Sequence, residues 1–200
     1  MKRVLVASKN KNKLNEIRKI LSSLNVEVSS VYDFCSMSGD IAETGSSFEE
    51  NACIKALVFS ELVEDFVIAD DSGLCVDYLN GAPGVFSARF AGEDADDKQN
   101  NEKLLEKLRG VESEQRTAKF VCVIALAKKG EIVKTFRGEC QGNIAEEARG
   151  EGGFGYDPLF LLENGNTMAE ISAEEKNRVS HRARALEKLK KFIGNYQCED

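Results

Sequence analysis

Two adjacent carboxylates, Asp70 and Asp71, are the side chains most suited to chemistry in this sequence. They follow the apolar run 66–69 and precede Ser72-Gly73, after which the chain becomes apolar again. This pattern predicts a buried strand that ends in a tight turn and displays both acids there. Because unpaired buried carboxylates are costly, we expect a positive group beside them, and Mg²⁺ suits carboxylate and phosphate oxygens. The alternative is an Asp-rich turn that caps a strand through its own backbone.

A lysine-rich segment near the N-terminus could bind an anion. Residues 3–7 predict a strand, and the apolar residues of 14–24 recur at helical spacing. The segment Ser8-Lys9-Asn10-Lys11-Asn12-Lys13 joins them as a polar loop. A loop that enters a helix offers unpaired N–H groups and a favourable dipole to a phosphate. It is not a Walker A loop, since it has no glycine, and the alternative is a solvated basic loop.

A second cation could come from a helix predicted to begin near Ser47. Ser47 and Glu50 fit a capping box, and an apolar stripe follows at helical spacing. Lys55 lies on this helix, and the acid Glu43 lies in the loop before it. Lys55 could support the phosphate site, although an exposed helix lysine is the commoner case.

The segment 150–158 combines four glycines with Phe154 and Tyr156. Glycines let a backbone approach a ligand closely, and an aromatic ring can offer its face to a base. With Asp157, and with His181 and Arg182 further on, these residues could recognise a base. The alternatives are an irregular loop whose rings fill the core and, for His181 and Arg182, the solvated start of a helix.

The composition excludes several classes of protein. The net charge of -7 argues against a protein that coats duplex nucleic acid, which is normally basic. The single histidine excludes a histidine-rich metal site, and none of the six cysteines forms a C-x-x-C pair. No run suits a membrane span or a secretion signal, so we expect a cytoplasmic protein with reduced thiols, no membrane partner and no nucleic acid partner.

The order of the elements predicts the fold class. Strands and helices alternate early, and the apolar run 118–127 turns at Lys129-Gly130 into a hairpin with 132–138. This favours an α/β domain with a mixed sheet. We predict one domain over residues 1–200, either compact or divided into two lobes that share the sheet.

The sequence resembles the inosine triphosphate pyrophosphatases, also called XTP/dITP or non-standard purine nucleoside triphosphate pyrophosphatases. The similar motifs occur in the family's order over nearly the whole chain. One departure is Lys9, since the family usually begins this loop with Thr-Gly-Asn or Thr-Thr-Asn. The motifs are Ser8-Lys9-Asn10-Lys11-Asn12-Lys13; Glu43-Thr44-Gly45; Phe48 with Glu50-Asn51-Ala52 and Lys55-Ala56; 69–76; Gly81-Ala82-Pro83-Gly84 with Ser87-Ala88-Arg89; 152–158; and Glu175-Lys176 with Ser180-His181-Arg182.

The resemblance implies Mg²⁺-dependent cleavage of ITP, dITP or XTP into the monophosphate and pyrophosphate. It also implies an elongated mixed central sheet flanked by helices, two lobes with a cleft between them, and a homodimer. Glu43 and Asp71 would bind the metal, and Asp71 would also activate the attacking water. The residues implied to touch substrate are Ser8, Lys9, Asn10, Lys11, Asn12, Lys13, Lys55, Ser72, Phe154, Gly155, Tyr156, Asp157, Lys176, His181 and Arg182.

Two other functions are considered. A nucleotide sensor without catalysis could keep the same pocket, but it would be expected to lose a metal-binding acid, and Glu43, Asp70 and Asp71 are all present. An RNA-binding module is disfavoured by the acidic net charge.

Overall fold

The computed structural model describes residues 3–35 and 41–196, so Cys198, one of the six cysteines, lies outside the described residues. Short 3₁₀ helices stand at Val31–Asp33, Asp77–Leu79, Gly84–Arg89 and Ser113–Gln115. The other elements are β1 (Arg3–Val6), α1 (Lys11–Leu21), β2 (Glu27–Ser30), α2 (Phe48–Ser60), β3 (Phe66–Val76), α3 (Asp97–Lys107), β4 (Thr117–Lys128), β5 (Glu131–Ile144), β6 (Phe160–Leu161), α4 (Ala173–Val179) and α5 (His181–Tyr196).

The strands form one six-stranded sheet in the order β2-β1-β3-β4-β5-β6. β1 pairs in parallel with both β2 and β3, with Val4 opposite Val28 on one side and Phe66 on the other. β5 pairs antiparallel with β6, with Ile144 opposite Phe160. The sheet is therefore mixed and flanked by helices, which confirms the predicted fold class.

The chain divides into two compact units. Unit 1 is made of residues 1–71, 122–138 and 182–200, and unit 2 of residues 72–121 and 139–181. Three of the four boundaries fall inside β3, β4 and β5, and the fourth follows the first residue of α5, so each of these elements contributes residues to both units. A single domain over residues 1–200 with a cleft between two lobes stays a prediction.

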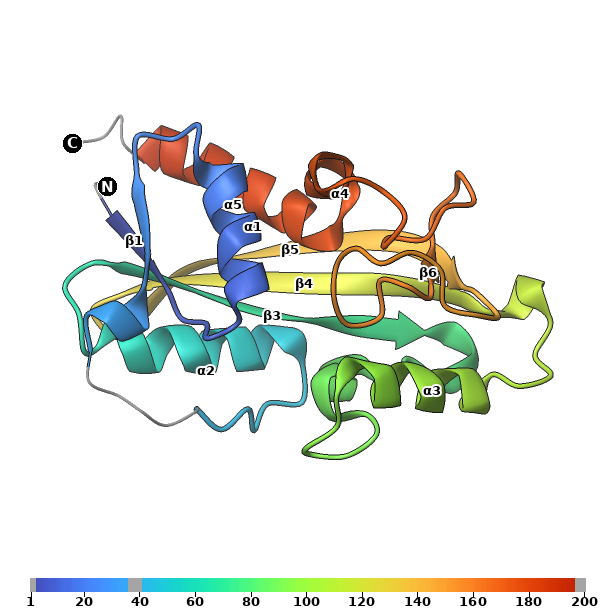
Figure 1. The fold of residues 1–200 in the computed structure, drawn as a ribbon. Helices are drawn as coiled ribbons and strands as arrows, with labels where there is room; N and C mark the ends of the chain where they lie inside the picture. The colour runs from blue at the N-terminus through green and yellow to red at the C-terminus, as the bar shows by residue number, and fades with distance from the viewer. Residues whose placement is uncertain (1–2, 36–40, 197–200) are drawn as a thin grey trace. The chain divides into compact units, whose positions relative to one another are not determined.

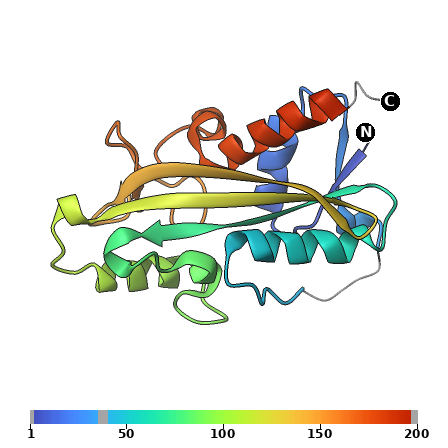
Figure 2. The same ribbon diagram turned by 180° about the vertical axis from the view of Figure 1, so that it is seen from behind.

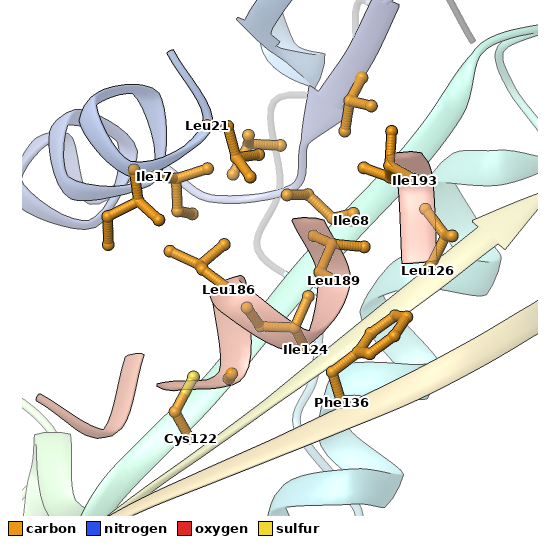
Figure 3. Packing of buried hydrophobic residues seen from close by; sticks show 14 of the residues in the cluster. Ile17, Leu21, Ile68, Cys122, Ile124, Leu126, Phe136, Leu186, Leu189 and Ile193 are labelled. Carbon is orange, nitrogen blue, oxygen red and sulfur yellow. The ribbon is translucent and has the colours of Figure 1, made fainter. Parts of the chain in front are cut away.

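In unit 1, helices cover both faces of the strands. Figures 1 and 2 show α1 and α5 on one face and α2 on the other. Ile68 of β3 packs in one cluster with residues of α1 and α5. Figure 3 shows Ile17 and Leu21 of α1 and Leu186 of α5 gathered with Ile68 in this core. The residues of the cluster are buried, and Leu21 and Leu186 are fully shielded from solvent.

The core of unit 2 is assembled around α3. Leu104 of this helix and Leu108, which follows its last residue, pack in one cluster with Leu74 of β3 and Phe120 of β4. The helix begins with a complete capping box in which Asp96 and Gln99 exchange hydrogen bonds. The capping box fixes where α3 begins, and the buried Leu104 holds the helix against the strands of this unit.

The prediction of a tight turn after the two acids is wrong. β3 continues without interruption through Asp70, Asp71, Ser72 and Gly73 as far as Val76. The strand tolerates the carboxylates because lysine and arginine side chains neutralise them on both faces, as the candidate site shows. The Asp-Ser-Gly sequence therefore does not act as a turn here.

Two helix starts differ in detail from the prediction. α1 begins at Lys11, so Lys11, Asn12 and Lys13 lie in its first turn, and the Asn10 side chain accepts from the N–H groups of Asn12 and Lys13. At α2, Ser47 accepts from the Glu50 N–H, but the Glu50 carboxylate accepts from Ser46 rather than Ser47. Among the described residues, none of the helices has both the length and the apolar character that crossing a membrane requires.

Replacement of Leu186 by Ala should lower the free energy of unfolding by about 2–5 kcal/mol, because it opens a cavity in the core of Figure 3. The matched control is Leu62→Ala, since Leu62 is 52% exposed and should leave the stability nearly unchanged. Urea unfolding followed by circular dichroism measures both. Equal midpoints for the two variants would contradict this account of the core.

Candidate active site

Asp70 is the centre of a buried charge cluster in unit 1. Its residue is 3% exposed, and its Oδ2 accepts hydrogen bonds from Arg182 Nε at 3.1 Å and from the Cys122 thiol at 2.9 Å. Lys13 Nζ forms an ion pair with the other carboxylate oxygen. Burial alone would raise the pKa of Asp70, but Arg182 and Lys13 outweigh it and hold the pKa well below its usual range. Asp70 is therefore an ionised group with a partner for each oxygen.

Glu16 completes this cluster. Arg182 Nη1 donates to Glu16 Oε2 at 2.5 Å, so two acids alternate with Arg182 and Lys13. Burial opposes the charge of Arg182, but Asp70 and Glu16 more than compensate and raise its pKa. Because these residues come from α1, β3 and α5, the ion pairs fix the first turn of α1 against the sheet.

Asp71 points to the opposite face of β3, where it meets Lys55 of α2. Lys55 Nζ donates to Glu43 Oε1 at 2.6 Å, to the Asp70 backbone carbonyl at 2.9 Å and to Asp71 Oδ1 at 3.4 Å. Burial raises the pKa of Asp71, and Lys55 acts in the opposite direction. The structure thus brings together Glu43, Lys55 and Asp71.

The loop that carries Glu43 is held by the first turns of α2. The buried Asn51 side chain accepts a hydrogen bond from the Gly45 N–H at 2.8 Å. A Cβ at position 45 would approach Asn51 Oδ1 and Glu50 Cβ to 2.7 Å, so only glycine fits here without movement of the loop. Asn51 therefore fixes the backbone at Gly45, two residues after Glu43.

The acids of unit 1 fit a divalent metal that is shared with a ligand. Asp71 Oδ2 is buried and accepts no hydrogen bond from any described residue. No group of three or more His, Cys, Asp or Glu side chains among the described residues could enclose a metal ion by itself. Mg²⁺ is commonly held by one or two carboxylates plus water and substrate phosphates, and the pair Glu43 and Asp71 suits that arrangement.

Unit 2 also contains a buried ion pair, which joins Asp157 of the glycine-rich segment to Lys176 of α4. Lys176 Nζ lies 2.6 Å from Asp157 Oδ2, and both side chains are buried. The same oxygen accepts from the Phe154 N–H at 2.8 Å, while Lys176 Nζ lies 4.5 Å from the centre of the Phe154 ring. Gly153 has φ +75° and leaves the space that Asp157 needs, since a Cβ there would overlap the carboxylate. The segment presents a fixed aromatic ring beside a lysine.

Tyr156 and Gly155 are held by neighbouring elements. Tyr156 is buried and its hydroxyl donates to the Ser87 carbonyl at 2.8 Å, while burial raises its pKa. The Gly155 N–H donates to Asp97 and its carbonyl accepts from Asn101, so α3 fixes this part of the segment. The Tyr156 ring fills the core of unit 2, as the alternative interpretation expected for the aromatic residues.

A model of the Ham1 family matches residues 4–192 of this sequence. The chain belongs to the Ham1 family. A dITP/XTP pyrophosphatase of Listeria innocua is 53% identical over 194 residues, which are 96% of this chain and 95% of that protein. The corresponding Bacillus subtilis protein, also named dITP/XTP pyrophosphatase, is 49% identical and covered to 98%. The structure of a HAM1 protein from Coxiella burnetii aligns with a TM-score of 0.89 and 41% identity over 98% of this chain and 100% of that one. The resemblance inferred from the motifs is confirmed.

In this Ham1 family chain, His181 and Arg182 are buried, so the interpretation as a solvated helix start is wrong. The His181 ring stacks on Phe120 of unit 2, with centroids 4.7 Å apart. Arg182 belongs to unit 1, where Asp70 and Glu16 engage its Nε and Nη1. Their role toward a base stays a prediction.

Most of the other predicted residues of the Ham1 chain lie in the loop and first turn of α1, and Ser72 lies on β3. The Ser8 hydroxyl accepts from the Asn10 N–H, and Lys9 Nζ lies 5.3 Å from the centre of the Tyr32 ring. Lys11 and Asn12 are exposed, whereas Ser72 is partly buried on β3. The loop and first turn of α1 thus present exposed polar groups next to Lys13.

Sequence reasoning missed the contributions of Glu16 and Cys122. Glu16 follows Lys13 by three positions, which places both on one face of α1 and is a usable signal. Cys122 lies inside an apolar strand and resembles any other core thiol, so no signal in the sequence marks its contact with Asp70.

Replacement of Lys176 by Met should destabilise the protein by about 3–5 kcal/mol, because it leaves the buried Asp157 carboxylate without its counter-ion. The matched control is Lys98→Met, whose side chain is 83% exposed in a pair with Glu102 and should have little effect. Thermal and urea unfolding compare the two. A Lys176→Met protein as stable as Lys98→Met would disprove the buried ion pair.

Proposed function

We propose that this protein hydrolyses non-standard purine nucleoside triphosphates, namely ITP, dITP and XTP, to the monophosphate and pyrophosphate. The observation that carries the proposal is the convergence of Glu43 and Asp71, from two separate segments, on Lys55 Nζ. The names of the relatives, dITP/XTP pyrophosphatase, support the substrate class because identity is about half over nearly the full chain.

Glu43 and Asp71 would hold Mg²⁺ through carboxylate oxygens. When bound, the metal supplies charge stabilisation for the phosphates and makes a bound water more acidic. The metal-binding role is supported by the all-oxygen donor set and by the buried Asp71 Oδ2, for which no described residue provides a donor. Asp70, whose oxygens are engaged by Arg182, Cys122 and Lys13, is assigned a structural role.

Asp71 is assigned the role of the base. Lys55 holds Asp71 Oδ1 at 3.4 Å, which fixes the carboxylate so that it can orient a water and accept its proton. Attack of that water on the α-phosphorus would break the bond to the oxygen that bridges the α and β phosphates, and pyrophosphate would leave. Positioning and charge stabilisation dominate the catalysis of phosphoryl transfer. Lysines near the two acids, such as Lys13 and Lys55, suit that chemistry.

The loop and first turn of α1 are assigned to the phosphates. The Asn10 cap and the N-terminus of α1 offer backbone N–H groups, and Lys13 is held in place by its buried partner Asp70. Lys55 is assigned to the phosphates as well. The residues with this role are Ser8, Lys9, Asn10, Lys11, Asn12, Lys13 and Lys55.

The polar cluster of unit 2 is assigned to the base and sugar. The Phe154 ring can stack on a purine, and Lys176, fixed by Asp157, is a donor for the 6-oxo group of hypoxanthine or xanthine. Adenine carries an amino group at that position, which would leave a buried donor unpaired. The residues of unit 2 with this role are Ser72, Phe154, Gly155, Tyr156, Asp157, Lys176 and His181. A role of Arg182, which belongs to unit 1, toward the base stays a prediction. A homodimer and a cytoplasmic location complete the proposal and rest on the sequence.

The substrate class is tested by incubating the protein with ITP, dITP, XTP, ATP and GTP in the presence of Mg²⁺. We expect rapid release of pyrophosphate from the first three and slow release from ATP, measured by a coupled pyrophosphate assay. Tight binding of ITP without turnover would favour a nucleotide sensor instead. Equal turnover of ATP would refute the base preference.

Replacement of Asp71 by Asn should lower kcat for ITP by two or more orders of magnitude, because an amide cannot accept the proton of the water. The control is Asp33→Asn, an exposed acid of the 3₁₀ helix at Val31–Asp33, which should keep the wild-type kcat. Steady-state kinetics separate kcat from KM for both variants. A normal kcat in a folded Asp71→Asn protein would remove Asp71 as the base.

A further inference from the structure

Lys55 Nζ is paired with the same two carboxylates that the proposed metal site requires. It lies 2.6 Å from Glu43 Oε1 and 3.4 Å from Asp71 Oδ1, and these are the two carboxylates assigned to the metal. A hard divalent cation binds carboxylate oxygens at about 2.0–2.6 Å. A metal bound to these carboxylates would therefore lie close to a like charge on the ammonium group. The two cations compete for one pair of acids.

The position of Lys55 is built into unit 1. Its side chain is only 13% exposed, and it extends from α2, which packs on the face of β3 that carries Asp71. A third acceptor, the backbone carbonyl of Asp70, fixes Nζ at 2.9 Å and is part of the sheet itself. The three oxygen acceptors of Lys55, two of them on carboxylates, hold the ammonium group in place. The ammonium is a resident counter-ion of the acid pair.

We propose that Lys55 competes with a free divalent cation for Glu43 and Asp71, so that the metal binds tightly only together with a phosphate chain that offers Lys55 new acceptors. This inference rests on the proposed metal site and names a regulation of that site. The paired acids carry two negative charges, and Lys55 cancels one of them before any ligand arrives. Phosphate oxygens are the natural replacement partners for the lysine because they too are strong acceptors.

The coupling between metal and nucleotide must act in both directions. If the nucleotide tightens binding of the metal by relieving the competition, the metal tightens binding of the nucleotide by the same factor. Lys55 is then the residue that makes the two ligands cooperative. Removal of its charge should strengthen binding of the metal alone and weaken the cooperativity.

The test titrates Mn²⁺ into the protein without nucleotide and measures free Mn²⁺ by electron paramagnetic resonance. The Lys55→Met variant should bind Mn²⁺ at least tenfold more tightly than wild type. The matched control is Lys119→Met, because Lys119 also pairs with one acid, Glu139, at 3.4 Å and is partly exposed, and it should match wild type. The double variant Lys55→Met with Glu43→Gln should lose the increased affinity for Mn²⁺. This result would show that the increase depends on the acid pair.

Equal or weaker binding of Mn²⁺ by a folded Lys55→Met protein would overturn the proposal. If that variant does not fold, the wild type decides: an α,β-methylene analogue of ITP should tighten Mn²⁺ binding at least tenfold. An unchanged affinity for Mn²⁺ would equally reject the competition.

The two proposals fail in distinguishable ways. Absence of turnover in the substrate panel, with Mn²⁺ binding as expected, would remove the hydrolytic function and leave the competition intact. Turnover of ITP without the gain in Mn²⁺ affinity would remove only the role of Lys55.

Discussion

A buried carboxylate in the middle of a strand is the constraint on which the rest of unit 1 depends. Asp70 is shielded from water, so its charge requires Arg182 and Lys13, and Arg182 in turn requires Glu16. Burying ion pairs yields little net stability, because desolvation offsets much of the attraction, but removing one partner is costly. The arrangement therefore serves geometry: it ties α1, β3 and α5 together and fixes Lys13 at the start of α1.

The pleat of β3 separates two neighbouring acids into two environments. Asp70 faces the side with Arg182 and Cys122, where each oxygen has a partner. Asp71 faces α2, where Lys55 holds one oxygen and no described residue satisfies the other. One step along a strand reverses the direction of the side chain, so two adjacent acids of one strand lie in different surroundings. Because the two residues are adjacent in the chain, the ion pairs that fix Asp70 also fix the backbone at Asp71.

The periodicity of the sequence predicted α1, α2 and the β4–β5 hairpin, and the motifs predicted that Glu43 and Asp71 would come together. Neither the periodicity nor the motifs predicted that β3 runs through Asp70 and Asp71. An Asp-Asp-Ser-Gly stretch has the composition of a turn, and its compensating cations are distant in sequence, since Arg182 lies 112 positions from Asp70. The ion pairs formed in the folded protein therefore outweigh the local turn propensity of this stretch. The sequence alone likewise does not reveal that the Ser87 carbonyl accepts from the Tyr156 hydroxyl, since the two residues lie 69 positions apart.

The stacking of His181 on Phe120 has a practical consequence for spectroscopy. The chain contains one histidine, so its imidazole gives a single set of proton resonances with no assignment problem. The ring lies nearly parallel to the phenyl group, at an interplanar angle of 16°, which places its protons in the shielding region of an aromatic current. Any event that alters this stack changes the frequency of that one signal. The protein thus carries a natural magnetic-resonance reporter in the core of unit 2, without isotope-labelled side chains or added probes.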